Sequence, residues 1–377
     1  MKLLIPALVL MSASVTTTET GRPGTAVHRL TDGTLIEAQA RIGKREVRLA
    51  TPFGDRVITR AEYGGKANTS LDALAAEYRA AAKKLKVRDI AGHRALAEQC
   101  RSKGYLTGLR RQLNVLLASD TDDKWARMIL SQVAAVHRVH RDEGVTKGRK
   151  LRKFIDFLLE DLARRDNVGA VIAAEKARTL PQHLVFRPAT KALKHSKTRV
   201  RWVGAHLLRD VTGKPARVQN LFRRSLQDGV FAVRRECVRA LKTTDDGSMV
   251  NVYAAQLSNP DNTIKARAAQ ALGELGAKAA AAPLAKALAA SFKPNRVHII
   301  NITQMAYVKD YDVEVAQTAF IADPIVDILQ EGSILEVALI SVGVVRHVYR
   351  NNLRRLTGVD LGTDPKAWRD WVKKNVK

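Results

Sequence analysis

Five leucines recur along the second half of the chain at nearly constant intervals. They are Leu162, Leu193, Leu226, Leu257 and Leu288, separated by 31, 33, 31 and 31 residues. A second marker, the apolar residue that opens the following helical segment, keeps the same period. These residues are Val168, Val200, Val233 and Ile264, separated by 32, 33 and 31 residues. Two markers that share one period indicate an array of repeated supersecondary units.

Each repeated unit is predicted to be a helix, a polar turn and a second helix. The turns consist of residue types that favour turns and helix N-caps. They are Asp166-Asn167, Ser196 to Thr198, Asp228-Gly229 and Asn259 to Asn262. One helix pair cannot bury its apolar face alone, whereas stacked pairs bury a continuous core between them. Residues 162–290 are therefore predicted to form an α-solenoid.

The unit LSNPDNTIKARAAQALGELGAKAAAAPLAKAL at 257–288 resembles the HEAT repeat of the phycobilisome-lyase-like class. The matching residues are Leu257, Pro260, Ile264, Arg267, Ala268, Ala269, Ala271, Leu272, Gly273, Leu275, Gly276, Pro283, Leu284 and Leu288. The preceding units match less fully. The resemblance implies HEAT-type helical hairpins, and it leaves the function open because such repeats serve many unrelated roles.

The N-terminus has the pattern of a secretory signal peptide. Lys2 precedes a short apolar run, and small residues follow at 12–14. We expect residues 1–14 to be a cleaved signal, which predicts a secreted or periplasmic protein. The alternative is a buried first strand or helix. No other stretch approaches the length of a membrane-spanning helix, so no span is expected in the mature chain.

Three further regions precede the repeats. Residues 15–27 predict a flexible lead-in, and 28–62 alternate with regular turns, which predicts a small antiparallel β-meander. Residues 70–161 show helical periodicity and are similar to tetratricopeptide-like helix pairs. The fold class predicted is mainly α, with this β unit at the N-terminal end.

Residues 291–377 break the repeat pattern. The β-branched runs at 313–321 and 333–342 predict a hairpin with a turn at Glu331-Gly332, inserted in the solenoid or capping it. Two closing helices follow, the last with Asp364 as N-cap and Pro365 at its first position. This ending resembles the closing segment of secreted bacterial HEAT-repeat proteins of unassigned role.

The chain carries 64 Lys and Arg against 37 Asp and Glu, a formal net charge of +27. Such a surface attracts polyanions, although a basic, merely soluble surface gives the same number. Cations at equivalent repeat positions, with a basic run before the repeats, are the candidate binding residues. They are Lys150, Arg152, Lys153, Lys197, Arg199, Arg201, Arg234, Arg235, Arg239 and Lys265. For Arg201, Arg234 and Lys265 the alternative is packing or capping within the turn.

No nucleophile elbow, phosphate-binding loop or metalloprotease motif occurs in the sequence. No catalytic residue and no cofactor is therefore predicted. His137 and His140 are spaced to share a helix face near two acids, which makes them weak candidates for a metal site. The alternative is a polar surface helix. Cys100 and Cys237 lie far apart and form no metal-binding pattern.

Two hypotheses follow for function. The first is a non-catalytic, secreted or periplasmic scaffold that binds a protein or an anionic polymer along the solenoid. The second is a nucleic-acid or other polyanion binder, similar to the HEAT-like alkylpurine DNA glycosylases, which uses a basic solenoid face. A lyase-like enzyme acting on a chromoprotein is suggested by the family name alone. An intact or a cleaved N-terminus separates the first two hypotheses.

Overall fold

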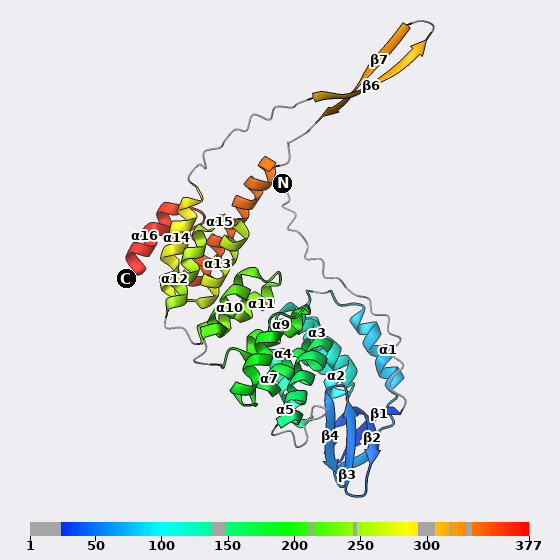
Figure 1. Cartoon of the computed structure of the whole chain (residues 1–377). Helices are drawn as coiled ribbons and strands as arrows, with labels where there is room; N and C mark the ends of the chain where they lie inside the picture. The colour runs from blue at the N-terminus through cyan, green and yellow to red at the C-terminus, as the bar shows by residue number, and fades with distance from the viewer. Residues whose placement is uncertain are drawn as a thin grey trace. The chain divides into compact units, whose positions relative to one another are not determined.

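The structure, a computed structural model, describes residues 24–86, 88–137, 148–211, 215–243, 247–292, 306–316, 319–328 and 334–376. The described chain is mainly helical, with an antiparallel five-stranded sheet near its beginning (Figure 1). It divides into two compact units. The first unit takes in the residues up to 157 together with 165–172, and the second takes in 158–164 and 173–377.

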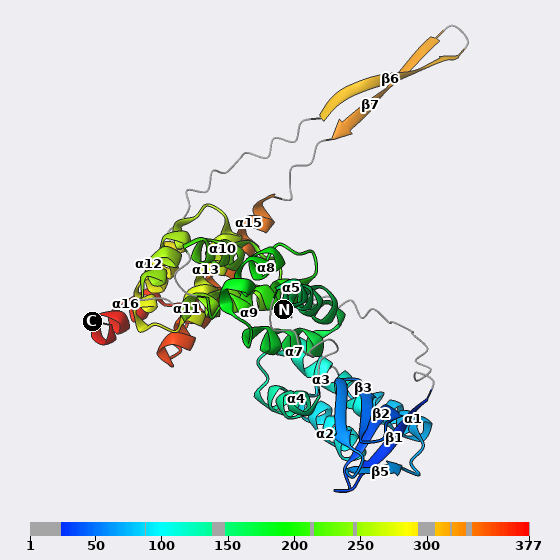
Figure 2. The ribbon, with the colours of Figure 1, turned by 60° about the horizontal axis from the view of Figure 1, so that its bottom comes forward.

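The sheet of the first unit has the strand order β4-β3-β2-β1-β5, and every neighbouring pair is antiparallel (Figure 2). Its strands are β1 (Thr25–Leu30), β2 (Leu35–Ile42), β3 (Glu46–Thr51), β4 (Gly54–Thr59) and β5 (Tyr63–Lys66). Alternation is clearest in β3, where Val47 and Leu49 are buried and Glu46 and Arg48 are exposed. One face of the sheet therefore faces the core and the other faces solvent.

The sheet is larger than the predicted meander over 28–62. Strand β1 already begins at Thr25, inside the predicted lead-in, and β5 lies beyond residue 62. Strand β5 pairs with β1, so the fifth strand closes back on the first instead of extending the meander. The sequence Tyr-Gly-Gly-Lys does not predict a strand, because glycine is depleted in strands. The predicted signal peptide and residues 15–23 lie outside the described residues.

Helices follow the sheet in the first unit. They are α1 (Leu71–Ala82), α2 (Ile90–Ser102), α3 (Leu106–Ser119), α4 (Lys124–Val136) and α5 (Gly148–Asp156). Ser70, Asp89 and Asp123 act as N-caps of α1, α2 and α4 through their side-chain oxygens. Helix α3 packs against α2 and β2, and its Leu109 and Leu113 are fully buried.

Glu37 of β2 ties the sheet to the start of α3. Its carboxylate accepts hydrogen bonds from the backbone N–H and the hydroxyl of Thr107, at 2.7 and 2.6 Å. A carboxylate is favourable at a helix N-terminus because it satisfies N–H groups that have no partner in the helix. Burial nevertheless raises the pKa of Glu37, and the bonds with Thr107 oppose that rise. Glu37 is therefore a capping residue supplied by a neighbouring element.

The repeated markers fall at the ends of helices. The helices from here on are α6 (Ala163–Arg165), α7 (Asn167–Arg178), α8 (Gln182–Ala192), α9 (Thr198–Leu207), α10 (Pro215–Gln227), α11 (Phe231–Lys242), α12 (Ser248–Ala255), α13 (Asn262–Leu275), α14 (Ala281–Ala290), α15 (Ile334–Thr357) and α16 (Pro365–Asn375). A π-helical turn, Phe157–Leu162, joins α5 to α6, and short 3-10 segments lie at Gln256–Ser258 and Lys278–Ala280. Val200 and Val233 are the third residues of α9 and α11 and are buried.

Helix packing in the second unit follows the repeat. Helix α8 packs on α9, α10 on α11 and α12 on α13. The second helices also contact one another in sequence, α9 with α11, α11 with α13, and α13 with α15 (Figures 1 and 2). Helix α15 contacts α14 as well, so these two helices pair although the chain between them is long.

A two-stranded antiparallel sheet, β6 (Ala306–Ala316) with β7 (Ala319–Ile328), lies in the sequence between α14 and α15. The strands predicted at 313–321 and 333–342 are wrong. Residues 313–321 span the end of β6 and the start of β7, and residues 334–342 belong to α15. The run at 334–342 misled the prediction because β-branched residues favour strands, whereas its continuation to Thr357 is too long for a strand. The predicted turn residues Glu331 and Gly332 lie outside the described residues.

The closing helices pack tightly. Gly273 of α13 lets α15 approach, since a Cβ at this position would lie 2.0 Å from the side-chain oxygen of Asn352. Asp364 caps α16 by accepting from the N–H of Lys366 at 2.8 Å, which confirms that prediction. Trp368 is fully buried. Among the described residues, no helix combines the length and the apolar character that a membrane crossing requires.

Candidate binding site

Arg201 of α9 and Arg234 of α11 are equivalent residues that make the same local contacts. The Nη1 of Arg201 donates to the carbonyls of His195 and Ser196, at 3.0 and 2.7 Å. The Nη1 of Arg234 donates to the carbonyls of Asp228 and Gly229, at 2.9 and 3.1 Å. In both units, then, the arginine caps the turn that precedes its helix.

The two arginines differ in their second partner. Arg201 forms a two-point ion pair with Asp228, with Nε and Nη2 donating to the two carboxylate oxygens at 2.7 and 3.1 Å. The side chain of Asp228 is 1% exposed. Arg234 instead donates through Nη2 to the amide oxygen of Gln270 of α13, at 3.3 Å. The ion pair joins α9 to the next unit, whereas Arg234 reaches the next unit only through a neutral amide.

The other predicted repeat cations have diverse surroundings. Arg239 donates to Glu274 at 2.7 Å, and Arg199 donates to the carbonyl of Arg164 at 3.1 Å. Lys265 lies 3.3 Å from the side-chain oxygen of Asn262, and Lys197 is exposed at the start of α9. Several members of the predicted stripe are thus engaged within the protein.

The basic run before the repeats lies on α5. Lys150, Arg152 and Lys153 are exposed, while Leu151 and Phe154 on the same helix are buried. Helix α5 belongs to the first unit and the repeat cations belong to the second. The run is a solvent-facing side of an amphipathic helix.

The predicted metal candidates do not form a described cluster. His137 is buried, its Nδ1 lies 2.6 Å from the carbonyl of Val133, and burial lowers its pKa. His140 lies outside the described residues. Among the residues that the structure describes, no three His, Cys, Asp or Glu side chains are grouped to hold a metal ion.

The two cysteines are free, buried thiols. Burial raises the pKa of Cys100 to about 12 and also raises the pKa of Cys237. Since the thiolate is the reactive form, neither is activated as a nucleophile.

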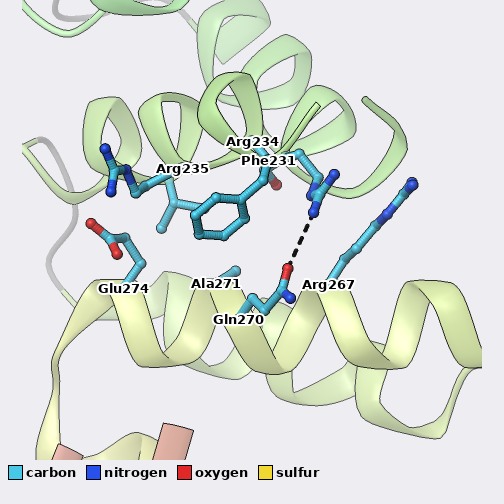
Figure 3. A pocket seen from close by; sticks show the side chains of 9 residues that line it. Phe231, Arg234, Arg235, Arg267, Gln270, Ala271 and Glu274 are labelled. Carbon is cyan, nitrogen blue, oxygen red and sulfur yellow. Dashed lines mark hydrogen bonds between the residues drawn. The ribbon is translucent and has the colours of Figure 1, made fainter. Parts of the chain in front are cut away.

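Helices α11 and α13 flank an open surface hollow, whose empty volume is ≈ 240 Å³ with open solvent included. It is lined by Ser225, Phe231, Arg234, Arg235, Val238, Arg267, Gln270, Ala271 and Glu274. We call these residues the α11–α13 hollow. Figure 3 shows the ring of Phe231 at its centre, between Arg235 and Arg234 and above Ala271. The guanidinium groups of Arg234 and Arg235 lie 5.6 and 5.8 Å from the centre of this ring, within the range of cation–π attraction.

Positive charge accumulates at one end of the hollow. The pKa of Arg234 is lowered to about 10, mainly by burial and then by the charge of Arg267, while Asp228 partly opposes the shift. Arg267 donates to the backbone carbonyl of Leu226 at 2.7 Å. Among the described residues, no carboxylate oxygen lies within 4 Å of Arg234 or Arg267 as an ion-pair partner. An anion placed there would favour the charged form of Arg234.

The acid at the other end of the hollow is already neutralised. Glu274 pairs with Arg239 of α11 and Arg355 of α15, each at 2.7 Å. Burial opposes its ionisation, but these two arginines lower its pKa overall. The hollow can therefore hold an anion at its Arg234 and Arg267 end and an apolar group along Phe231.

Sequence reasoning missed two parts of this site. Phe231 is 48% exposed, and the only signal was an aromatic residue at a helix start, three residues before Arg234. Gln270 was missed because its role depends on the packing of α13 against α11.

Comparison with protein families identifies HEAT repeats over residues 219–299. This span contains most of α10 and all of α11 to α14, so it includes the hollow. Comparison with curated proteins and with solved structures finds no match. The prediction of HEAT repeats is thus confirmed over residues 219–299, and HEAT repeats are generally non-catalytic scaffolds for protein interaction.

Proposed function

We propose that this HEAT-repeat protein is a non-catalytic scaffold of the cell envelope, which binds a protein partner along an α-solenoid. The observation that carries the proposal is the succession of second helices, each in contact with the next from α9 to α15. Such stacking gives an extended surface on which one face of several units is available together. The signal-like start at residues 1–14 supports export.

The α11–α13 hollow supports the choice of binding face. Phe231 and Val252 are both exposed apolar residues in this region, but only Phe231 lines a hollow with charged neighbours. Exposed aromatic residues beside arginine are enriched where proteins bind one another.

Site-specific photo-crosslinking tests the scaffold function. A photoreactive phenylalanine analogue at position 231 should give a crosslinked product with a defined protein in the native host. The same analogue at Val252 of α12 is a matched control, because Val252 is also exposed but does not line the hollow. Absence of any crosslinked protein from positions 231, 252 and other exposed positions of α9 to α13 would overturn the scaffold proposal.

Determination of the mature N-terminus tests the location. Export predicts an N-terminus near Val15 in protein isolated from the native host. An intact Met1 would overturn the envelope location and would favour the second candidate function.

The second candidate is binding of a polyanion such as nucleic acid. The turn between β2 and β3 favours it, because Arg41, Lys44 and Arg45 surround the exposed side chain of Ile42 there. Phosphate binding by such cations predicts a steep fall of DNA affinity with salt. A flat salt dependence, or no binding to duplex DNA at low salt, would exclude this candidate.

A further inference from the structure

We infer that the α11–α13 hollow binds a carboxylate side chain from an acidic, partly apolar segment of the partner protein. This inference rests on the proposed scaffold function and specifies what the partner must present. It comes from the internal comparison of two equivalent arginines, together with the aromatic surface beside one of them.

Arg201 shows what an arginine at this repeat position binds when its contacts are complete. Its Nη1 caps the turn, and the edge formed by Nε and Nη2 binds both oxygens of Asp228. That edge of a guanidinium matches the geometry of a carboxylate. Within the protein, a carboxylate is therefore the natural partner of this edge.

Arg234 uses the same edge incompletely. Its Nη1 caps the turn in the same way, while Nη2 makes one long bond to Gln270. No described residue accepts a hydrogen bond from its Nε. A carboxylate arriving from outside could take the position relative to Arg234 that Asp228 takes relative to Arg201.

The acid equivalent in sequence does not fill this position. Asp261 follows Arg234 at the same interval as Asp228 follows Arg201. Its carboxylate instead accepts from the N–H of Thr263 at 2.7 Å and caps α13. That hydrogen bond is the main cause of the lowered pKa of Asp261, and the charge of Arg267 is the smallest contribution.

Phe231 adds an apolar requirement. Nearly half of this residue is exposed, and the walls around it include the buried residues Val238 and Ala271. An apolar residue next to the ligand carboxylate would cover this ring.

The same contacts favour a protein over a nucleic acid as the source of the anion. A nucleic-acid strand presents regularly spaced phosphates and needs a row of cations that are not already paired. In the neighbouring positions Arg201 and Arg239 are paired with Asp228 and Glu274. One local anion position beside an aromatic ring fits an acidic peptide.

Fluorescence anisotropy of the purified full chain tests this inference. The probe is a short fluorescein-labelled peptide in which Glu alternates with Leu, and its counterpart carries Gln in place of Glu. The Glu peptide should bind at low salt and the Gln peptide should not.

Two variants locate the binding. Gln270→Glu keeps the shape of the side chain and supplies an internal carboxylate to Arg234, so it should weaken peptide binding at least ~10-fold without unfolding the chain. Phe231→Ala should weaken it several-fold. Arg369→Gln on α16 is the matched control for loss of charge, since Arg369 is exposed and, among the described residues, donates only to the carbonyl of Pro365. Its affinity should equal that of the wild type.

Three results would overturn the inference. They are equal affinity for the Glu and Gln peptides, an unchanged affinity in Gln270→Glu, and oligothymidylate binding that exceeds peptide binding and is lost in Gln270→Glu. The last result would assign the hollow to phosphate. If the peptide-binding test fails but crosslinks form elsewhere on α9 to α13, the carboxylate inference is wrong and the scaffold function still holds. The two proposals can therefore fail separately.

Discussion

The junction of α9 with α11 and the junction of α11 with α13 are built from equivalent helices but differ in charge balance. At the first, Arg201 binds two turn carbonyls and the buried carboxylate of Asp228. At the second, Arg234 binds two turn carbonyls and the amide of Gln270. One repeat position can therefore serve packing in one unit and remain suited to an external anion in the next.

The largest effect on the unfolding free energy is expected at the ion pair of Arg201 with Asp228. Asp228→Asn would leave the guanidinium of Arg201, whose side chain is 13% exposed, without its counter-charge. Breaking such a buried pair costs about 3 kcal/mol of unfolding free energy. Urea unfolding followed by tryptophan fluorescence measures it, because Trp202 is buried in α9. A loss below ~1 kcal/mol would show that the pair contributes little to this junction.

A pH-dependent effect is expected at the neutralised end of the second junction. Glu274→Gln should lower the unfolding free energy at neutral pH by about 2 kcal/mol, since the carboxylate charge that pairs with Arg239 and Arg355 is lost.

The sign of the pH dependence follows from the lowered pKa of Glu274. Its folded-state pKa lies below the ordinary value near 4.5. The stabilisation is therefore complete above that value and is lost as pH falls through the folded-state pKa. The difference in unfolding free energy between the wild type and Glu274→Gln should therefore be smaller near pH 3 than at pH 7. A difference independent of pH would contradict the assigned role of the two arginines.

A substitution that gives Arg234 a carboxylate partner is expected to stabilise the fold. Gln270→Glu would give Arg234 a carboxylate partner and should raise the unfolding free energy by about 1 kcal/mol, because hydrogen bonds to charged groups exceed those to amides. The same substitution is expected to weaken peptide binding. Destabilisation by Gln270→Glu would show that the charge of Arg234 is already compensated. Gln270→Met is the matched control that lacks both the amide and the charge.

The smallest effect on stability is expected at Phe231. The residue is 48% exposed, so Phe231→Ala should change the unfolding free energy by about 0.5 kcal/mol or less. Because the same variant is expected to weaken peptide binding, it separates binding from folding. A loss comparable to that of Asp228→Asn would assign Phe231 to the core of the junction instead.

The repeat was the most predictable part of the fold. Buried residues such as Leu193 and Val233 recur because every pair of helices buries the same face. The C-terminal strands were mispredicted, since an apolar run such as 334–342 satisfies strand and helix patterns equally until its length is considered. Strand β5 was missed because its pairing with β1 depends on contacts across the sheet.

The positions of the candidate cations could be predicted from the sequence, but the partners that each one binds could not. Repeat equivalence places Arg201 and Arg234 at the same position, and the sequence is compatible with partner binding or with capping of the turn at both. The sequence interval alone would pair Arg234 with Asp261, yet Asp261 caps its own helix. Which acid reaches which arginine depends on local competition for hydrogen bonds, and this competition is visible only in three dimensions.

The most direct test of this account is a pair of double-mutant cycles on unfolding free energy. One cycle combines Arg201→Met with Asp228→Asn, and the other combines Arg234→Met with Gln270→Met. We expect a coupling energy of about 3 kcal/mol for the first pair and below ~1 kcal/mol for the second. Equal coupling energies would contradict it, because Arg234 would then be as fully partnered within the protein as Arg201.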